Sequence, residues 1–173
     1  MPDRIGGNAK PIRTALSSED GVDLAIIELL FFAYRDFTSD PDQILAKYEF
    51  GRAHHRVLHF VNRMPGLTVA ELLDVLKITK QSLARVLKQL IDTGHIVQAQ
   101  GPKDRRQREL YPTGKGRDLA LTLARPQSSR IHDALKAAAP AERSAIERFL
   151  RAMVNPELRP QIDNLPAVPG GGE

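Results

Sequence analysis

Apolar residues recur at three- and four-residue spacing along the first third of the chain, which predicts two long helices over 21–38 and 41–62. Two apolar stripes run side by side along the first of these helices, so it needs two packing partners. Asp40 and Pro41 stand between the two segments, and an Asp N-cap followed by Pro in the first turn is typical of a helix start. The Met-Pro-Gly segment 64–66 ends the second helix.

The predicted elements become shorter after this point. Thr68 and Glu71 have the spacing of a capping box at the start of a short helix. Thr79 is the expected N-cap of another helix over 80–93, whose leucine, valine and isoleucine residues form one apolar face. Gly94 follows at the position where a left-handed residue commonly ends a helix.

A hairpin is predicted next. Residues 95–100 and 108–111 have the composition of two strands around a polar loop over 101–107, and Pro112 ends the second strand because it cannot donate to the ladder. The order of helix, short turn, helix and hairpin is that of a winged helix-turn-helix. We therefore expect a mainly α fold with a small β-hairpin wing.

Helical patterning returns beyond the hairpin. Thr113 is the expected N-cap of a further helix, in which Pro126 is expected to cause a kink or a break. Apolar residues as far as Leu135 indicate that the helical segment continues beyond this proline. A last helix opens at 140 and ends near 153. Four prolines and a run of three glycines (170–172) then predict a flexible tail over 156–173.

The composition narrows the class of protein. The chain has no cysteine, which excludes disulfides, cysteine nucleophiles and Cys-based zinc sites. No apolar run approaches the ~20 residues that span a bilayer, and residues 1–17, predicted to be a flexible arm, contain no signal-peptide core. We expect a cytoplasmic protein that has no membrane partner.

The positive charge is concentrated in one segment. Residues 63–117 contain 11 Lys and Arg against 5 Asp and Glu, whereas the rest of the chain has 14 against 16. A basic segment of this kind is a candidate footprint for a polyanion such as DNA, although a solvated charged face is the simpler explanation.

The predicted helix over 80–93 carries a polar and cationic face opposite its apolar one. Arginine can pair with guanine, serine and glutamine bind base edges or phosphates, and lysine neutralises phosphate. An ordinary exposed helix face has similar residues, so this helix alone does not decide the function. The candidate DNA contacts on it are Thr79, Lys80, Gln81, Ser82, Arg85 and Lys88.

The hairpin loop adds a second basic feature. Its segment 103–108 contains four cationic residues that do not contribute to a hydrophobic core. Arginine is favoured in a narrow DNA groove, where the negative potential is strongest. Arg105 and Arg106 are the candidate contacts. Asp104 is placed to hold the Arg106 guanidinium by a charge-assisted bond, while a simple turn-forming role is equally compatible with the sequence.

These residues bear a resemblance to a known family. The wing pattern of the MarR family is D-x-R, five residues, L-T, two residues and G, and this chain resembles it at Asp104-Arg105-Arg106, Pro112-Thr113 and Gly116. Pro112 stands where the family usually has Leu, but Thr113 and Gly116 stay in register. The segments 67–72, 78–82 and 90–96 also look like the helix-turn-helix of that family.

The resemblance implies a homodimer in which the first and last helices of the subunits interlock. One domain over 18–155 would then contain a DNA-binding lobe at about 63–117 and dimerisation helices at about 20–40 and 118–155. It also implies a pocket for a small aromatic or anionic effector between these regions. Candidate lining residues are Phe31, Phe32, Arg35, His55 and His59, for each of which plain core packing is an alternative.

Other functions find less support in the sequence. Residues 114–116 (Gly-Lys-Gly) lack the glycine spacing of a phosphate-binding loop, and the spacing of the other residues indicates no catalytic site. We therefore predict that the protein is not an enzyme and binds no cofactor. His54, His55 and His59 could hold a metal in a metal-responsive regulator, but no carboxylate is placed with them. A dimeric interaction module without DNA binding is disfavoured by the arginine-rich wing.

The sequence therefore predicts a DNA-binding transcriptional regulator. In the most specific form, it is a ligand-responsive repressor that acts as a homodimer on an inverted repeat in double-stranded DNA.

Overall fold

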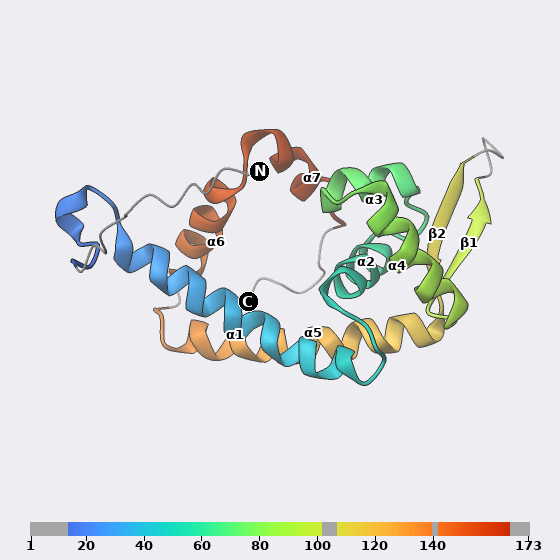
Figure 1. Cartoon of the computed structure of the whole chain (residues 1–173), viewed down its shortest axis with the longest axis horizontal. Helices are drawn as coiled ribbons and strands as arrows, with labels where there is room; N and C mark the ends of the chain where they lie inside the picture. The colour runs from blue at the N-terminus through green and yellow to red at the C-terminus, as the bar shows by residue number, and fades with distance from the viewer. Residues whose placement is uncertain (1–13, 102–106, 140–141, 167–173) are drawn as a thin grey trace, which may run out of the picture. The chain divides into compact units, whose positions relative to one another are not determined.

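A computed structural model of the chain describes residues 14–101, 107–139 and 142–166. Helices dominate these residues, with one two-stranded sheet (Figure 1). No helix in the described ranges is long and apolar enough to cross a membrane. The elements are η1 (Ser18–Asp20), α1 (Leu24–Ala46), α2 (Arg52–Arg63), α3 (Val69–Leu76), α4 (Lys80–Asp92), β1 (Ile96–Gln100), β2 (Arg108–Pro112), α5 (Gly114–Lys136), α6 (Glu142–Met153), η2 (Pro156–Leu158) and α7 (Arg159–Asp163).

The chain divides into two compact units, residues 1–36 and residues 37–173. The described part of the first unit consists of η1 and the beginning of α1. The second unit contains the end of α1 and all later elements. The predicted helix-turn-helix and hairpin all belong to this second unit.

The prediction that a new helix begins at Asp40 was wrong. α1 continues through Pro41 to Ala46, and a short connection then leads to α2. Proline has no N–H for the carbonyl four residues earlier, which here is that of Phe37. The Gln127 side chain of α5 donates from Nε2 to this carbonyl at 3.1 Å instead. Asp40 does not cap a helix but pairs with Arg130 at 2.8 Å.

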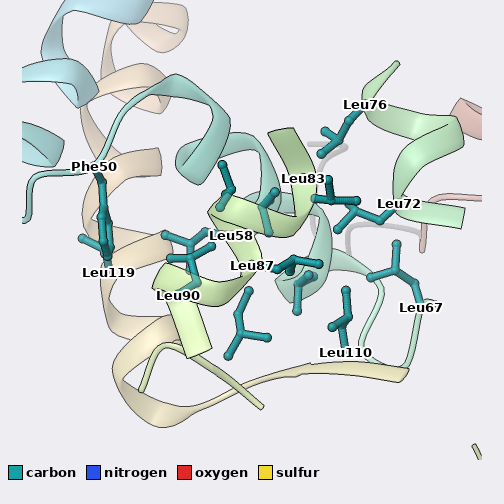
Figure 2. Close-up of a cluster of buried hydrophobic side chains, with 14 of the residues drawn as sticks. Phe50, Leu58, Leu67, Leu72, Leu76, Leu83, Leu87, Leu90, Leu110 and Leu119 are labelled. Atoms are coloured by element: carbon teal, nitrogen blue, oxygen red, sulfur yellow. The ribbon is translucent and has the colours of Figure 1, made fainter. Parts of the chain in front are cut away.

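The core of the second unit lies between α2, α3, α4, the hairpin and the first half of α5. Figure 2 shows leucines from these elements converging, including Leu58 of α2, Leu72 of α3, Leu90 of α4 and Leu110 of β2. All four are fully buried. Complete burial of one such side chain contributes roughly 1.5–3 kcal/mol, so this cluster holds the short helices α3 and α4 in place.

The predicted caps of the two short helices are confirmed. Thr68 Oγ1 accepts from the Glu71 N–H, and the Glu71 carboxylate accepts from the Thr68 N–H at 2.7 Å, which completes the capping box. Thr79 Oγ1 accepts from the Ser82 N–H at 3.1 Å at the start of α4. Gly94 has the left-handed φ of 74° that the sequence predicted after α4.

The two strands pair antiparallel as expected, from Ile96 opposite Pro112 to Gln100 opposite Arg108. The segment before α3 extends this sheet, because the Leu110 N–H donates to the Leu67 carbonyl at 3.0 Å and the Gly66 N–H donates to the Leu110 carbonyl at 2.8 Å. The wing is therefore attached to both ends of the helix-turn-helix.

The start of α5 is held tightly against the end of α4. Thr113 caps α5 through the Gly116 N–H, and its hydroxyl also donates to the Gly94 carbonyl at 2.7 Å. Gly116 is buried, and a Cβ at this position would lie 1.9 Å from the His95 carbonyl oxygen. Only glycine fits this contact, which explains the glycine of the wing pattern.

The C-terminal part differs from the prediction in two places. α5 runs through Pro126 to Lys136, so the break that was expected as an alternative to a kink is absent, and the expected continuation to Leu135 is confirmed. The predicted tail begins with η2 and α7 rather than with irregular chain. The Arg63 guanidinium donates to the Pro166 carbonyl, which joins this segment to the end of α2.

The contact at Gly116 gives a first prediction. We expect Gly116→Ala to destabilise the fold by about 1–3 kcal/mol or more, because the added methyl overlaps backbone that cannot yield cheaply. Gly114→Ala is the matched control in the same helical turn, since its Cβ would meet nothing within 4 Å. We expect the control to be neutral or slightly stabilising in urea denaturation. Equal stability of the two variants would contradict the close contact.

Candidate nucleic-acid interface

The polar face of α4 is exposed to solvent, as predicted from the sequence. Lys80, Gln81 and Arg85 are exposed, and within the described residues neither Lys80 nor Arg85 has a carboxylate partner. The opposite face of the helix, with Leu83 and Leu90, is buried in the core. The N-terminal half of α4 therefore offers positive charge and hydrogen-bonding groups to solvent.

Three other candidate contacts have partners inside the chain. Thr79 and Ser82 are joined by the cap and by a 2.9 Å bond between their hydroxyls. Lys88 forms an ion pair with Asp92 one turn later on the same helix. The charge of Lys88 is thus partly neutralised, whereas that of Arg85 is not.

The orientation of α4 relative to α2 is set by His54, a residue whose role the sequence did not reveal. Its Nδ1 accepts from the Gly51 N–H at 3.1 Å, so Nε2 carries the proton and donates to Gln89 Oε1 at 2.8 Å. The ring stacks on Phe50 with centroids 4.7 Å apart. Burial lowers the pKa of His54 despite its bond to Gln89, and the nearby charge of Arg85 lowers it further. The imidazole is therefore neutral at pH 7.

A second histidine, His95, lies just beyond the C-terminal end of α4. His95 is only 1% exposed, its Nδ1 lies 2.9 Å from the Thr93 hydroxyl, and its ring meets Phe50 edge-on. Burial lowers the pKa of His95, with the Lys115 ammonium adding to the effect. Phe50 thus contacts both histidines, and this aromatic cluster packs the connection after α1 against α2 and against the link between α4 and the wing.

Arg56 fixes the turn inside the helix-turn-helix. Its guanidinium donates to the Leu76 carbonyl at 2.8 Å, at the end of α3 where Lys77 adopts a left-handed φ of 51°. This bond satisfies a carbonyl that a helix end leaves without a partner. The separation of α3 and α4 is therefore determined in part from α2.

The wing lies next to α4 (Figure 1). Gln107 and Arg108, at the start of the second strand, are exposed. Asp104, Arg105 and Arg106 lie outside the described residues, so the contact of Asp104 with Arg106 stays a prediction. Gln100 pairs with Arg108 at the end of the described hairpin.

The predicted effector residues fall into the two units. Phe31 and Phe32 are 70% and 56% exposed in the first unit, where the Arg35 guanidinium lies over the Phe32 ring. His55 and His59 lie on α2 in the second unit, and desolvation lowers the pKa of both. A common pocket of these five residues stays a prediction.

One cavity between α2 and α5 includes a predicted residue. It has a volume of about 280 Å³ and is lined by His59, Asn62, Arg63 and Arg117 together with apolar residues of α5. Asn62 Oδ1 is buried without a hydrogen-bond partner in the described part of the chain. Sequence reasoning missed Asn62, Arg63 and Arg117, because they come together only when α2 packs on α5. In the described residues no group of three or more His, Cys, Asp or Glu could hold a metal ion.

Comparison with known proteins identifies the family. A sequence model described as the MarR family matches residues 48–107. The HTH-type transcriptional regulator PetP of Rhodobacter capsulatus is 49% identical over 133 residues, which are 77% of this chain and 80% of PetP. This chain belongs to the MarR family. It is accordingly a helix-turn-helix transcriptional regulator and not an enzyme.

Solved structures show the same fold. A MarR protein from Peptoclostridium difficile has a TM-score of 0.65 at 19% identity, covering 90% of this chain and 96% of its own. Streptococcus pneumoniae FabT in complex with DNA has a TM-score of 0.65 at 17% identity, covering 82% and 97%. The mainly α winged helix-turn-helix with a two-stranded wing, predicted from the sequence, is thus confirmed for this MarR-family chain.

Proposed function

We propose that this MarR-family regulator binds double-stranded DNA as a cytoplasmic homodimer, with the N-terminal half of α4 in the major groove. The observation that carries the proposal is the exposure of Lys80, Gln81 and Arg85 on a helix whose other face is buried. FabT and a mutant of Staphylococcus aureus MepR, both similar in fold, have been solved with DNA or an oligodeoxyribonucleotide. The arginine-rich wing would make the second contact, in the minor groove.

The homodimer is supported by the apolar surface of two segments. In the first unit Leu29, Phe31 and Tyr34 of α1 are each more than 60% exposed. In the second unit Phe149, Leu150 and Met153 form an exposed apolar stripe on α6. Monomeric proteins rarely leave contiguous apolar surface of this extent open to water. A second copy of the chain, bound about a two-fold axis, would cover both segments.

We further propose that the regulator is a repressor released from DNA by a small aromatic or anionic effector. The cavity between α2 and α5 supports this, because Arg63 and Arg117 supply positive charge beside the apolar side chains of Ala120 and Leu121. Guanidinium side chains bind a carboxylate through strong, charge-assisted hydrogen bonds. The neutral imidazole of His59 completes a site that is apolar with few polar groups, as small-molecule sites usually are.

DNA recognition by α4 predicts unequal effects of two cations. Arg85→Ala should weaken binding to an inverted repeat with half-sites roughly 34–36 Å apart by about 1–3 kcal/mol and relax the preference at one position per half-site. Lys88→Ala is the matched control, because Asp92 already neutralises this lysine. We expect a smaller loss for it and little change in specificity. Fluorescence anisotropy across a set of operator variants measures both, and equal losses would contradict a base-reading role for Arg85.

Assembly gives an independent prediction. Sedimentation equilibrium at micromolar concentration should give twice the chain mass of 19.2 kDa, because the apolar surface of α1 and α6 has no other cover in the proposal. Phe149→Glu should shift the protein toward monomers, whereas Arg148→Glu, at the neighbouring exposed position, should not. A folded wild-type monomer under these conditions would contradict the homodimer.

Effector binding predicts a change that depends on Arg117. Aromatic carboxylates such as salicylate should raise the melting temperature and weaken operator binding by a factor that corresponds to about 1–3 kcal/mol of coupling. Arg117→Gln should abolish both effects while leaving operator affinity without the carboxylate unchanged. If a panel of aromatic acids neither stabilises the protein nor releases DNA, the proposed response to such effectors is wrong.

A further inference from the structure

The most informative contact outside the DNA-binding face joins α1 to α5 near the boundary of the two units. Pro41 is buried inside α1 and cannot donate to the Phe37 carbonyl, which would otherwise lack a partner. Gln127 of α5 donates to that carbonyl at 3.1 Å. Phe37 is the first residue of the second unit. A side chain of α5 thus replaces a backbone bond of α1 at the place where the units divide.

A second bond lies one helical turn further along α5. Arg130 Nη2 is 2.8 Å from Asp40 Oδ2, and Asp40 is the residue before the proline. A cavity of about 550 Å³ adjoins this ion pair and is lined by Asp40, Pro126 and Arg130 among others. Pro126 of α5 therefore lies beside open space at this crossing, and Gln127 and Arg130 each make a polar contact with α1.

We propose that Gln127, assisted by Arg130, is a positioning residue that fixes the direction of α1 at Pro41. Proline is the commonest cause of a sharp helix kink, because the missing N–H and the displaced carbonyl weaken the helix on one side. With Gln127 bonded to Phe37 and Arg130 bonded to Asp40, residues 37–40 of α1 are held on α5. Without the Gln127 bond, the segment before Pro41 gains freedom to bend relative to α5.

This proposal rests on the proposed function for its regulatory meaning. The other end of α5 is fixed to the end of α4 by the hydroxyl of Thr113 and by the close contact at Gly116. One continuous helix therefore connects the Gln127 bond to the base of the wing. If α1 forms the dimer, its direction at Pro41 determines how the two α4 helices are spaced for the operator.

A double-mutant cycle tests the chemical basis. Gln127→Leu leaves the Phe37 carbonyl without a partner and should raise the unfolding equilibrium constant about 5–10-fold. Pro41→Ala restores a backbone N–H for the same carbonyl, so in this background Gln127→Leu should change the constant less than about 2-fold. Urea denaturation measures all four proteins. Equal costs in both backgrounds would overturn the role of Gln127 at Phe37.

A distance measurement tests the positioning role, which a merely stabilising bond would not affect. The chain has no native cysteine, so Glu28→Cys and Ala99→Cys, both at exposed sites, place nitroxide labels only in the first unit and on β1. Labelled chains diluted in unlabelled protein report the distance within one subunit by pulsed electron paramagnetic resonance. We expect Gln127→Leu to broaden or shift this distribution and Pro41→Ala to reverse the change.

The outcomes separate this proposal from the proposed function. An unchanged distance distribution in Gln127→Leu would overturn the positioning role even if the protein binds DNA as a dimer. A monomeric protein that fails to bind DNA would contradict the proposed function, yet the intrasubunit distance and the stability cycle would still decide whether Gln127 directs α1.

Discussion

The structure of the DNA-binding lobe depends on the contact between the end of α4 and the beginning of α5. The Thr113 N–H donates to the His95 carbonyl at 3.1 Å, the Lys115 ammonium donates to the Thr93 carbonyl at 2.8 Å, and Gly116 permits the backbones to touch. The C-terminal end of a helix carries partial negative charge, which the Lys115 ammonium offsets at the end of α4. These bonds join the residues that follow α4 to the first turn of α5, so the two helices are connected through residues 93–95.

This contact gives α5 its importance in the rest of the molecule. At its start, α5 is attached to the end of α4 and to the wing, whose strands flank the same junction. In its middle, it packs on α2 around the cavity with Arg63 and Arg117. Further along, Gln127 and Arg130 hold α1 at Pro41. The cavity and the contact at Pro41 are therefore both connected to α4 through the single helix α5.

The features predicted correctly from the sequence are those that a few neighbouring residues decide. The caps at Thr68, Thr79 and Thr113 and the left-handed glycine after α4 need only side chains within three positions. Pro41 was misplaced because local statistics favour a helix start there, whereas the carbonyl that it leaves without a donor is satisfied by a residue 90 positions away. The roles of His54 and His95 were missed for the same reason, since both depend on packing around Phe50.

The charges of the lobe are distributed so that one end of α4 is available to an anion. Cations near its C-terminal end are already engaged, since Lys88 pairs with Asp92 and Lys115 binds the carbonyl of Thr93. Lys80 and Arg85 lie in the first half, where the helix dipole also places partial positive charge. His54 beneath Arg85 stays neutral, which avoids repulsion and leaves the arginine to outside partners. The neutral imidazole and the paired lysine thus leave the positive charge of α4 concentrated in its N-terminal half.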